Sequence, residues 1–281
     1  MATPTSLGVV ASVPLTGQNY IDGILDFNKW GGSVGTAADL TWSLKSNNSY
    51  YSTDSITGYG PSNGSGQAWQ SGPALTSAQI AGIRNALSAW ADIANLHFAE
   101  VIDSSTVAGD IRFGTDSQQS TSEAVLPGPA SKAGDVWFGT NSNLLSPNPG
   151  TYAYLTFMHE IGHALGLDHP HDGRVIANSS LDALQFSIMS YRDFVGESLN
   201  QFFSDYFPTT PMLDDIAAMQ YLYGANMAAR SGNTTYSWTV GQKIYQTIWD
   251  GGGNDTIDWS NQSSAATINL NAGEWSYVGP G

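Results

Sequence analysis

The sequence predicts an α+β protein in which helices and short strands form one large domain and a region of strands and turns follows it. Three observations predict this fold class. The segment from Thr76 to Ile93 has the apolar spacing of a helix, and the apolar residues from Tyr152 to Met158 lead into a second helix that Gly166 can end. Short apolar segments typical of strands lie between the two helices. After Ala225 the chain changes to short strand-like segments separated by turns. A length of 281 residues accommodates one large domain and part of a second.

The composition excludes several classes of protein. There are 24 Asp and Glu residues against 9 Lys and Arg. This excess repels nucleic acid and anionic lipid, and it suits a protein that binds calcium through carboxylates. The chain contains no Cys, which excludes disulfides and thiolate metal sites. No segment approaches the length of a transmembrane helix, so we expect no membrane insertion.

The N-terminal part is weakly patterned at first. We expect residues 1–18 to be a flexible or pro-like lead, and no conventional secretory signal peptide is visible, since no Lys or Arg precedes Lys29. Residues 19–30 have a helical spacing that ends at two glycines. We expect a strand from Leu40 to Leu44 and loops from there to Pro73.

The central part begins with a helix whose first turn has a capping box, Thr76 with Gln79 three positions later. Its apolar residues lie along one stripe, so the helix is expected to pack against a sheet. Short strands are expected next, at residues 97–101, 110–113 and 135–138.

The most informative segment contains three histidines. On a helix, His159 and His163 lie on one face, and Glu160 lies one position further round. Gly166 can adopt the left-handed conformation that ends a helix and returns the chain, which brings His169 to the same point. Three nitrogen ligands leave one position of a zinc ion open, as in catalytic zinc sites. The sequence therefore predicts one catalytic Zn²⁺ ion.

The other two histidines have simpler interpretations. His171 lies two residues past His169, off the spacing of the motif, and we interpret it as solvated. His97 lies in a predicted strand and is interpreted as structural.

Residues 159–169 match the pattern His-Glu-x-x-His-x-x-Gly-x-x-His of metzincins, and residues 187–191 resemble the Met-turn of that clan. Three segments, HEIGHALGLDHP, QFSIMSY and PMLDDIAAMQYLYGAN, resemble the serralysin family, the secreted calcium-dependent zinc proteases of bacteria. The resemblance implies that Met189 forms an apolar floor beneath the histidines. It also implies that Tyr191 can bind the zinc ion at rest and support the oxyanion during turnover.

The resemblance further implies a mixed sheet whose edge strand borders the substrate cleft. We assign that strand to Ser122, Glu123, Ala124, Val125 and Leu126, where an extended substrate would add as a further strand. An ordinary loop is the alternative for these residues. Serralysins have aromatic residues here, whereas this chain has Glu123, Ala124 and Val125, so its subsite preference is open.

A further helix is predicted near residues 210–223. Thr210 is the expected cap, Pro211 occupies the first turn, and Asp214 and Asp215 lie near the positive end of the helix dipole. This helix start accounts for the paired carboxylates without a catalytic role.

The last part of the chain contains a run similar to Gly-Gly-x-Asp, the turn unit of calcium-binding β-rolls. By resemblance to serralysins, one structural Ca²⁺ ion is expected at Arg230, Gly232, Thr234, Asp250, Gly252 and Asp255, and Gly253 and Asp255 match part of a second site. A common hairpin turn is the alternative. We accordingly divide the chain into the lead, a metzincin protease domain at 19–229, and the incomplete start of a β-roll or β-sandwich domain at 230–281.

The resemblance implies a secreted zinc-dependent endopeptidase. Glu160 is expected to activate a water molecule that attacks peptide bonds of proteins, and Tyr191 to assist. We expect a monomeric, extracellular protein, with a proteinaceous inhibitor as a potential partner. One alternative is a catalytically silent metzincin fold that acts as a binding or assembly module, and another is an enzyme blocked by residues 1–18.

Overall fold

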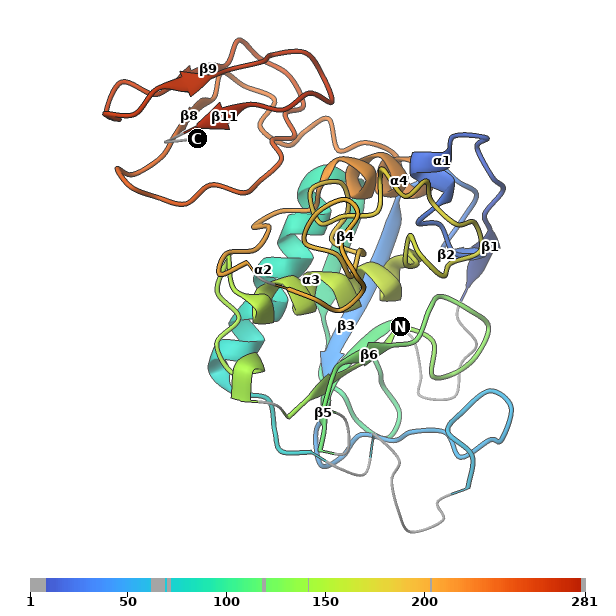
Figure 1. The fold of residues 1–281 in the computed structure, drawn as a ribbon. Coiled ribbons are helices and arrows are strands. Elements are labelled where there is room, and N and C mark those ends of the chain that lie inside the picture. Colours follow the sequence, from blue (N-terminus) through green and yellow to red (C-terminus); the bar gives the residue numbers. More distant parts are fainter. Residues whose placement is uncertain are drawn as a thin grey trace.

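The computed structural model describes residues 9–61, 69, 72–117, 120–140, 142–202 and 204–278. A five-stranded sheet of order β4-β3-β5-β7-β6 lies at its centre (Figure 1). Its strands are β3 (Ala38–Leu44), β4 (Leu96–Glu100), β5 (Ile111–Asp116), β6 (Glu123–Ala124) and β7 (Asp135–Gly139). Four of them are parallel, and β6 runs antiparallel to β7 at one edge. The sheet is therefore mixed, as predicted.

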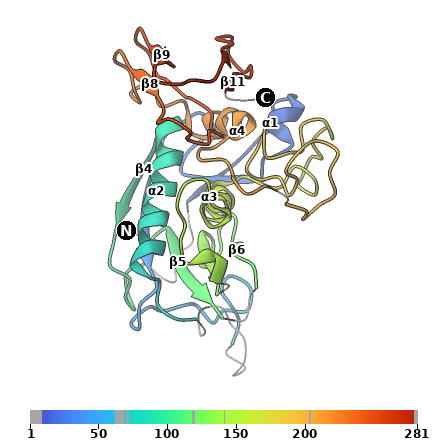
Figure 2. The ribbon, with the colours of Figure 1, turned by 60° about the vertical axis from the view of Figure 1, so that its left-hand side comes forward.

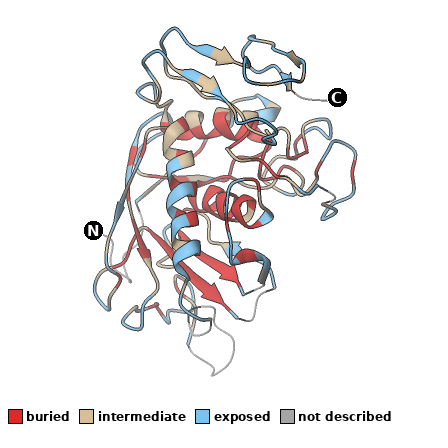
Figure 3. Ribbon diagram, turned by 90° about the vertical axis from the view of Figure 1, so that its left-hand side faces the viewer, coloured by how far each residue is buried: buried red, intermediate tan, exposed pale blue. Residues whose placement is uncertain are grey.

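Two helices, α2 (Ser77–Ile93) and α3 (Tyr152–Leu165), pack together beside the sheet (Figure 2). The predicted capping box of α2 is present, because Thr76 and Gln79 each accept the other's backbone N–H. Figure 3 shows that α2 is buried along one side and exposed along the other, as its apolar stripe predicts. Phe157 of α3 stacks on Phe138 of β7 with ring centroids 3.9 Å apart, which fixes α3 against the sheet. The fold class is α+β.

The N-terminal segment differs from the prediction. The helix expected over residues 19–30 is only α1 (Asn19–Asp22), and β2 (Asn28–Trp30) follows it. Strand β2 pairs with β1 (Val10–Ser12), so the prediction of a flexible lead at 1–18 is wrong for the described residues from Val10 onward. Backbone pairing of β2 with β1 prevails over the helical spacing of the apolar residues. Residues 1–8 lie outside the described part.

This segment also supports the chain that leaves α3. Leu25 forms a bridge with Leu167, and the indole N–H of Trp30 donates to the carbonyl of Ala164 at 2.7 Å. The N-terminal residues from β1 to β2 are therefore part of the domain that carries the three histidines.

The helix α4 (Leu213–Tyr223) begins later than predicted and ends at Gly224 as expected. Thr210 is not its cap, because its hydroxyl donates to the carbonyl of Thr247 at 3.3 Å. The carboxylate of Asp215 instead accepts the backbone N–H of Met212 at 2.7 Å. A short 3₁₀ helix, η2 (Ser142–Leu144), precedes α3.

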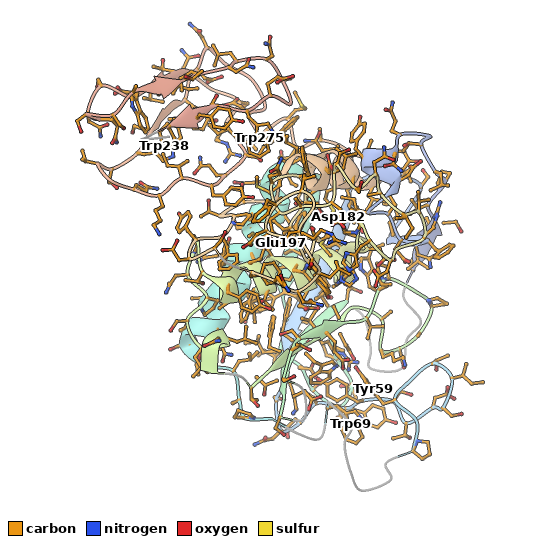
Figure 4. The ribbon with its side chains drawn as sticks, viewed as in Figure 1. Tyr59, Trp69, Asp182, Glu197, Trp238 and Trp275 are labelled. Carbon is orange, nitrogen blue, oxygen red and sulfur yellow. The ribbon has the colours of Figure 1, made fainter. Side chains whose placement is uncertain are left out.

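The C-terminal region lies beyond α4, at the end of the molecule where Figure 4 labels Trp238 and Trp275. Parallel strands β8 (Thr235–Ser237) and β9 (Thr256–Asp258) form one pair. Antiparallel strands β10 (Ala266–Thr267) and β11 (Tyr277–Val278) form the other. Arg230 joins this region to α2 through Asp92 at 2.9 Å. Within the described residues, every helix is too short or too polar to cross a bilayer.

Candidate metal centre

The three histidines of the motif converge on one point, as the sequence predicts. His159 and His163 lie one turn apart on α3, with their Nε2 atoms 3.1 Å apart. The Nε2 atom of His169 lies 3.2 Å from that of His159 and 2.9 Å from that of His163. We call these three residues the zinc site.

Gly166 allows His169 to return to the helix. Its φ of 107° is left-handed, and a Cβ atom at this position would lie 2.7 Å from the carbonyl oxygen of Asn28. Any other residue would therefore be strained and would collide with the N-terminal segment. The turn requires glycine for both reasons.

The second nitrogen of each ring shows that the site fits a cation. The Nδ1 atoms of His159 and His163 lie 2.9 and 2.8 Å from the carbonyl oxygens of Ile188 and Leu167. The Nδ1 atom of His169 lies 3.0 Å from Oδ1 of Asp172. Because these partners only accept hydrogen bonds, each Nδ1 carries the proton and each Nε2 presents a lone pair. Three lone pairs aimed at one another require a positive ion between them.

Burial keeps the imidazoles of His159 and His163 neutral, as zinc ligands must be. Burial, with a smaller contribution from the neighbouring His169, lowers the pKa of His159 to about 3. It also lowers the pKa of His163 well below its usual value, again with contributions from the neighbouring histidines.

Glu160 lies on α3 beside the zinc site and is largely buried, with an exposed fraction of 7%. Burial raises the pKa of its carboxyl group to about 8, and the negative charge of Glu123 adds to the shift. A cation in the zinc site acts in the opposite direction. These opposing influences are those that bring a general base into the neutral range.

The Met-turn packs beneath α3. Met189 is fully buried, and its sulfur would lie 2.8 Å from a Cβ atom at Gly162, so glycine leaves space for the methionine. Asp215 of α4 fixes this turn, because its carboxylate accepts the hydroxyl of Ser187 at 2.6 Å and the N–H of Ile188 at 2.9 Å. The sequence interpretation gave Asp215 only a role at the helix start. Its contact with the turn joins residues far apart in the chain and has no local signal.

Tyr191 faces the zinc site. Its ring centroid lies 4.5 Å from that of His169 and 5.5 Å from that of His159. Burial raises the pKa of Tyr191 to about 12, with a contribution from the charge of Glu160, so the phenol keeps its proton near neutral pH. Asp182, labelled in Figure 4, supports both neighbours of Tyr191, since it accepts Ser190 Oγ at 2.6 Å and Arg192 Nε at 2.8 Å. Asp182 was not identified from the sequence.

The interpretation of His171 as solvated is wrong. Only 9% of its side chain is exposed, and its ring stacks on that of His169 with centroids 5.1 Å apart. Its ring also lies 4.8 Å from that of Tyr191. The spacing of the motif excludes His171 as a third ligand but does not reveal that the loop returns it to the site.

The expected edge strand is shorter than predicted. Only Glu123 and Ala124 form β6, which pairs with β7 and lies in contact with α3. Of its neighbours, Val125 continues the hydrogen bonding toward Asp135 at 2.9 Å, and Ser122 Oγ accepts the N–H of Gly139 at 3.4 Å. Leu126 follows outside the strand. The position at the sheet edge matches the expectation, and the role in substrate binding stays a prediction.

The residues expected to bind calcium lie on two adjacent loops, 230–234 and 250–255, which we call the C-terminal loops. The parallel pairing of β8 with β9 places these loops side by side. The N–H of Thr234 donates to Asp255 Oδ1 at 2.9 Å, and the N–H of Gly252 donates to Asp250 Oδ1 at 2.9 Å. A Cβ atom at Gly253 would lie 2.5 Å from the carbonyl oxygen of Gly232, so the absence of a side chain allows the two loops to approach each other. Arg230, with φ of 50°, turns the first loop.

Comparison with known proteins agrees with this geometry. Residues 70–190 match the Matrixin family model, and residues 215–280 match the model Peptidase M10 serralysin C terminal. Serralysin A of Dickeya chrysanthemi is 37% identical over 232 residues, which cover 73% of this chain and 48% of the relative. Both matches and this relative show that the chain is similar to the serralysin-type metzincins. Serralysin B of the same organism is 35% identical over 89% of this chain and 55% of the relative.

Metalloprotease AprA of Pseudomonas entomophila is 35% identical over 69% of this chain and 46% of the relative. The chain thus spans about half the length of the curated relatives it matches.

Proposed function

We propose that the chain is a secreted zinc-dependent endopeptidase. The observation that carries this proposal is the convergence of three Nε2 lone pairs within 2.9–3.2 Å beside the buried carboxylate of Glu160. A zinc ion held there supplies a Lewis acid for the scissile carbonyl and lowers the pKa of a water molecule toward neutrality.

Side chains of this protein would carry out the proton transfers and stabilise the developing negative charge. Glu160 takes a proton from the attacking water and passes it to the departing amine, which its raised pKa allows. Tyr191 keeps its phenolic proton and donates a hydrogen bond to the negative oxygen that develops on the carbonyl. Asp182 and Asp215 hold the turn from which Tyr191 projects.

We further propose that the substrates are proteins or peptides in extended conformation, bound along the free edge of β6. A strand at a sheet edge offers backbone groups to an added strand, which gives affinity with little sequence preference. Ser122 to Leu126 are the residues proposed to border the substrate. A proteinaceous inhibitor would occupy the same edge, and we propose a monomeric, extracellular protein with structural calcium in the C-terminal loops.

The experiment is hydrolysis of an unfolded protein after removal of all metal and separate return of zinc and calcium. We expect no cleavage by the metal-free chain or with calcium alone, and cleavage once zinc is returned with calcium. A chain that binds both ions and still cleaves nothing would contradict the proposal, and it would favour a catalytically silent binding or assembly module.

A further inference from the structure

Glu123 is the one charged residue of β6, the outermost strand of the five-stranded sheet (Figure 1). Its side chain is exposed, and within the described residues no basic side chain lies at ion-pair distance from its carboxylate. Partial desolvation and the negative charge of Asp116 raise the pKa of Glu123, and Lys132 offsets this only in part. Lys132 lies over the ring of Tyr59 instead, with Nζ 5.8 Å from the centroid. The charge of Glu123 is therefore poorly neutralised by the described part of the chain.

The hydrogen bonding of β6 determines how Glu123 would meet an added strand. The N–H of Val125 donates to the carbonyl of Asp135 in β7 at 2.9 Å. Because backbone groups of alternate residues point to the same side of a strand, those of Glu123 also point to β7, and those of Ala124 point to the free edge. A substrate that adds antiparallel to β6 is thus hydrogen-bonded to Ala124. Its residue opposite Glu123 then forms a non-hydrogen-bonded pair, in which the side chains lie closest, with Cβ atoms about 4.5–5.5 Å apart.

The position opposite Glu123 lies near the zinc site. Glu123 is paired with Trp137, whereas its neighbour Ala124 is paired with Val136 and packs against the core that includes α3. The side chain of Glu123 therefore lies on the face of the sheet away from that core. Its charge still reaches the zinc site, because it raises the pKa of Glu160, and β6 contacts α3. A substrate residue opposite Glu123 is accordingly close to the bond that is cleaved.

We propose that Glu123 selects substrates that carry Lys or Arg at the position opposite it. A basic side chain there supplies the positive charge that Glu123 lacks, and it is also attracted by Asp116. Opposite charges directly across an antiparallel pair favour the pairing, whereas an acidic substrate residue would be repelled. The excess of acidic residues in the whole chain, 24 against 9 basic ones, attracts basic segments in the same sense. This inference rests on the proposed function, since it names the substrate class of that site.

The test begins with digestion of an unfolded protein by the full chain with zinc and calcium, and mass spectrometry of the products. With the cleavage sites aligned at the scissile bond, Lys and Arg should be enriched at one fixed position. Peptides that differ only there, as Lys, Gln or Glu, then give ratios of kcat/KM. Lys should exceed Gln by up to about fivefold and Glu by about tenfold. Both ratios should shrink at high salt, because ions screen the attraction.

Two variants of Glu123 separate its charge from its shape. Glu123→Gln removes the charge with little change of size, so the Lys-to-Gln ratio should fall to about one. Glu123→Lys should reverse the order, so that the Glu peptide is cleaved faster than the Lys peptide. Because each ratio compares two substrates of the same protein, a general loss of activity leaves it unchanged. Glu274→Gln, which removes an exposed acid of the C-terminal region, is the matched control and should keep the ratios of the parent.

The proposal and the proposed function fail in different ways. If the parent cleaves the unfolded protein without enrichment of Lys or Arg, or if Glu123→Gln keeps the ratios of the parent, selection by Glu123 is overturned and the proposed function stands. If the parent binds both ions and cleaves nothing, the proposed function is overturned and this inference falls with it.

Discussion

The zinc site and the C-terminal loops differ in how their potential ligands are held. His159 and His163 are buried on a helix of fourteen residues, and each ligand ring of the zinc site has its Nδ1 fixed by a second group. Asp255 is exposed and Asp250 is half-buried, and both lie on loops joined by strands of three residues each. Rigid elements with locked side chains preorganise a site. The folded domain therefore holds the three ligand side chains of the zinc site in position before an ion binds.

The C-terminal loops show the opposite arrangement. Asp250 accepts the hydroxyl of Tyr236 at 2.5 Å as well as the N–H of Gly252, and Asp255 accepts the N–H of Thr234. Their carboxylates thus hold the loops together, so an ion bound there competes with or replaces these hydrogen bonds. The comparison indicates that zinc would bind to a preformed site, whereas calcium would stabilise the loops that bind it.

Apart from Glu160, the largest effect is expected at Tyr191. Tyr191→Phe removes the phenolic proton and leaves the ring packed against the histidines, so kcat should fall by about 10²–10³ while bound zinc is retained. Steady-state kinetics with zinc analysis measures both quantities. An unchanged kcat would show that Tyr191 only packs against the zinc site.

A smaller effect is expected at Asp172, which orients His169. Asp172→Ala removes the acceptor of its Nδ1–H, and the affinity of the zinc site should fall by about 10–100-fold. Competition with a zinc chelator measures this change. Asp39→Ala is the control, because Asp39 accepts from the exposed His97 in the same way. Equal affinities in the two variants would remove the role of Asp172.

Bound calcium is expected to raise the stability of the folded chain and to leave the geometry of the zinc site unchanged. With calcium at about 100 times its dissociation constant, removal of the calcium should lower the free energy of unfolding by about 2.7 kcal/mol and the Tm by several degrees. Calorimetry of the zinc-loaded chain with and without a calcium-selective chelator measures the shift. Asp255→Ala should abolish the dependence on calcium and Asp205→Ala, an exposed acid outside the loops, should keep it. The calcium assignment fails if chelation leaves the Tm of the parent unchanged.

The smallest effect concerns pH and Asp214. Burial raises the pKa of Asp214 to about 8, with a contribution from the charge of Asp215. A raised pKa in the folded state gives stability that is present below the unfolded pKa of about 4 and is lost as pH rises through about 8. Asp214→Asn should therefore raise the Tm by a few degrees at pH 8 and little at pH 4. A variant with the same pH dependence as the parent would contradict the assignment.

The sequence correctly predicted the features that depend on residues close together in the chain. The capping box of α2, the paired histidines of α3 and the left-handed turn at Gly166 each depend on residues within a few positions. The family resemblance added Met189 and Tyr191 to the predicted site residues. In the structure Met189 packs against Gly162 of α3, and the ring of Tyr191 lies beside that of His169.

Contacts between distant segments could not be predicted in this way. Asp182 and Asp215 hold the Met-turn through side chains that no periodicity indicates. The N-terminal helix was overestimated, because the apolar spacing of residues 19–30 does not reveal that β2 pairs with β1. His171 was assigned to solvent because spacing along the chain does not show that it stacks on His169.

The most direct test of the account is Glu160→Gln beside the parent chain, with zinc and calcium present and an unfolded protein as substrate. Because Glu160 is proposed to act as a base without binding the metal, the variant should keep its zinc while turnover falls by about 10²–10⁴. A variant that loses its zinc, or that cleaves as fast as the parent, would contradict the role of Glu160.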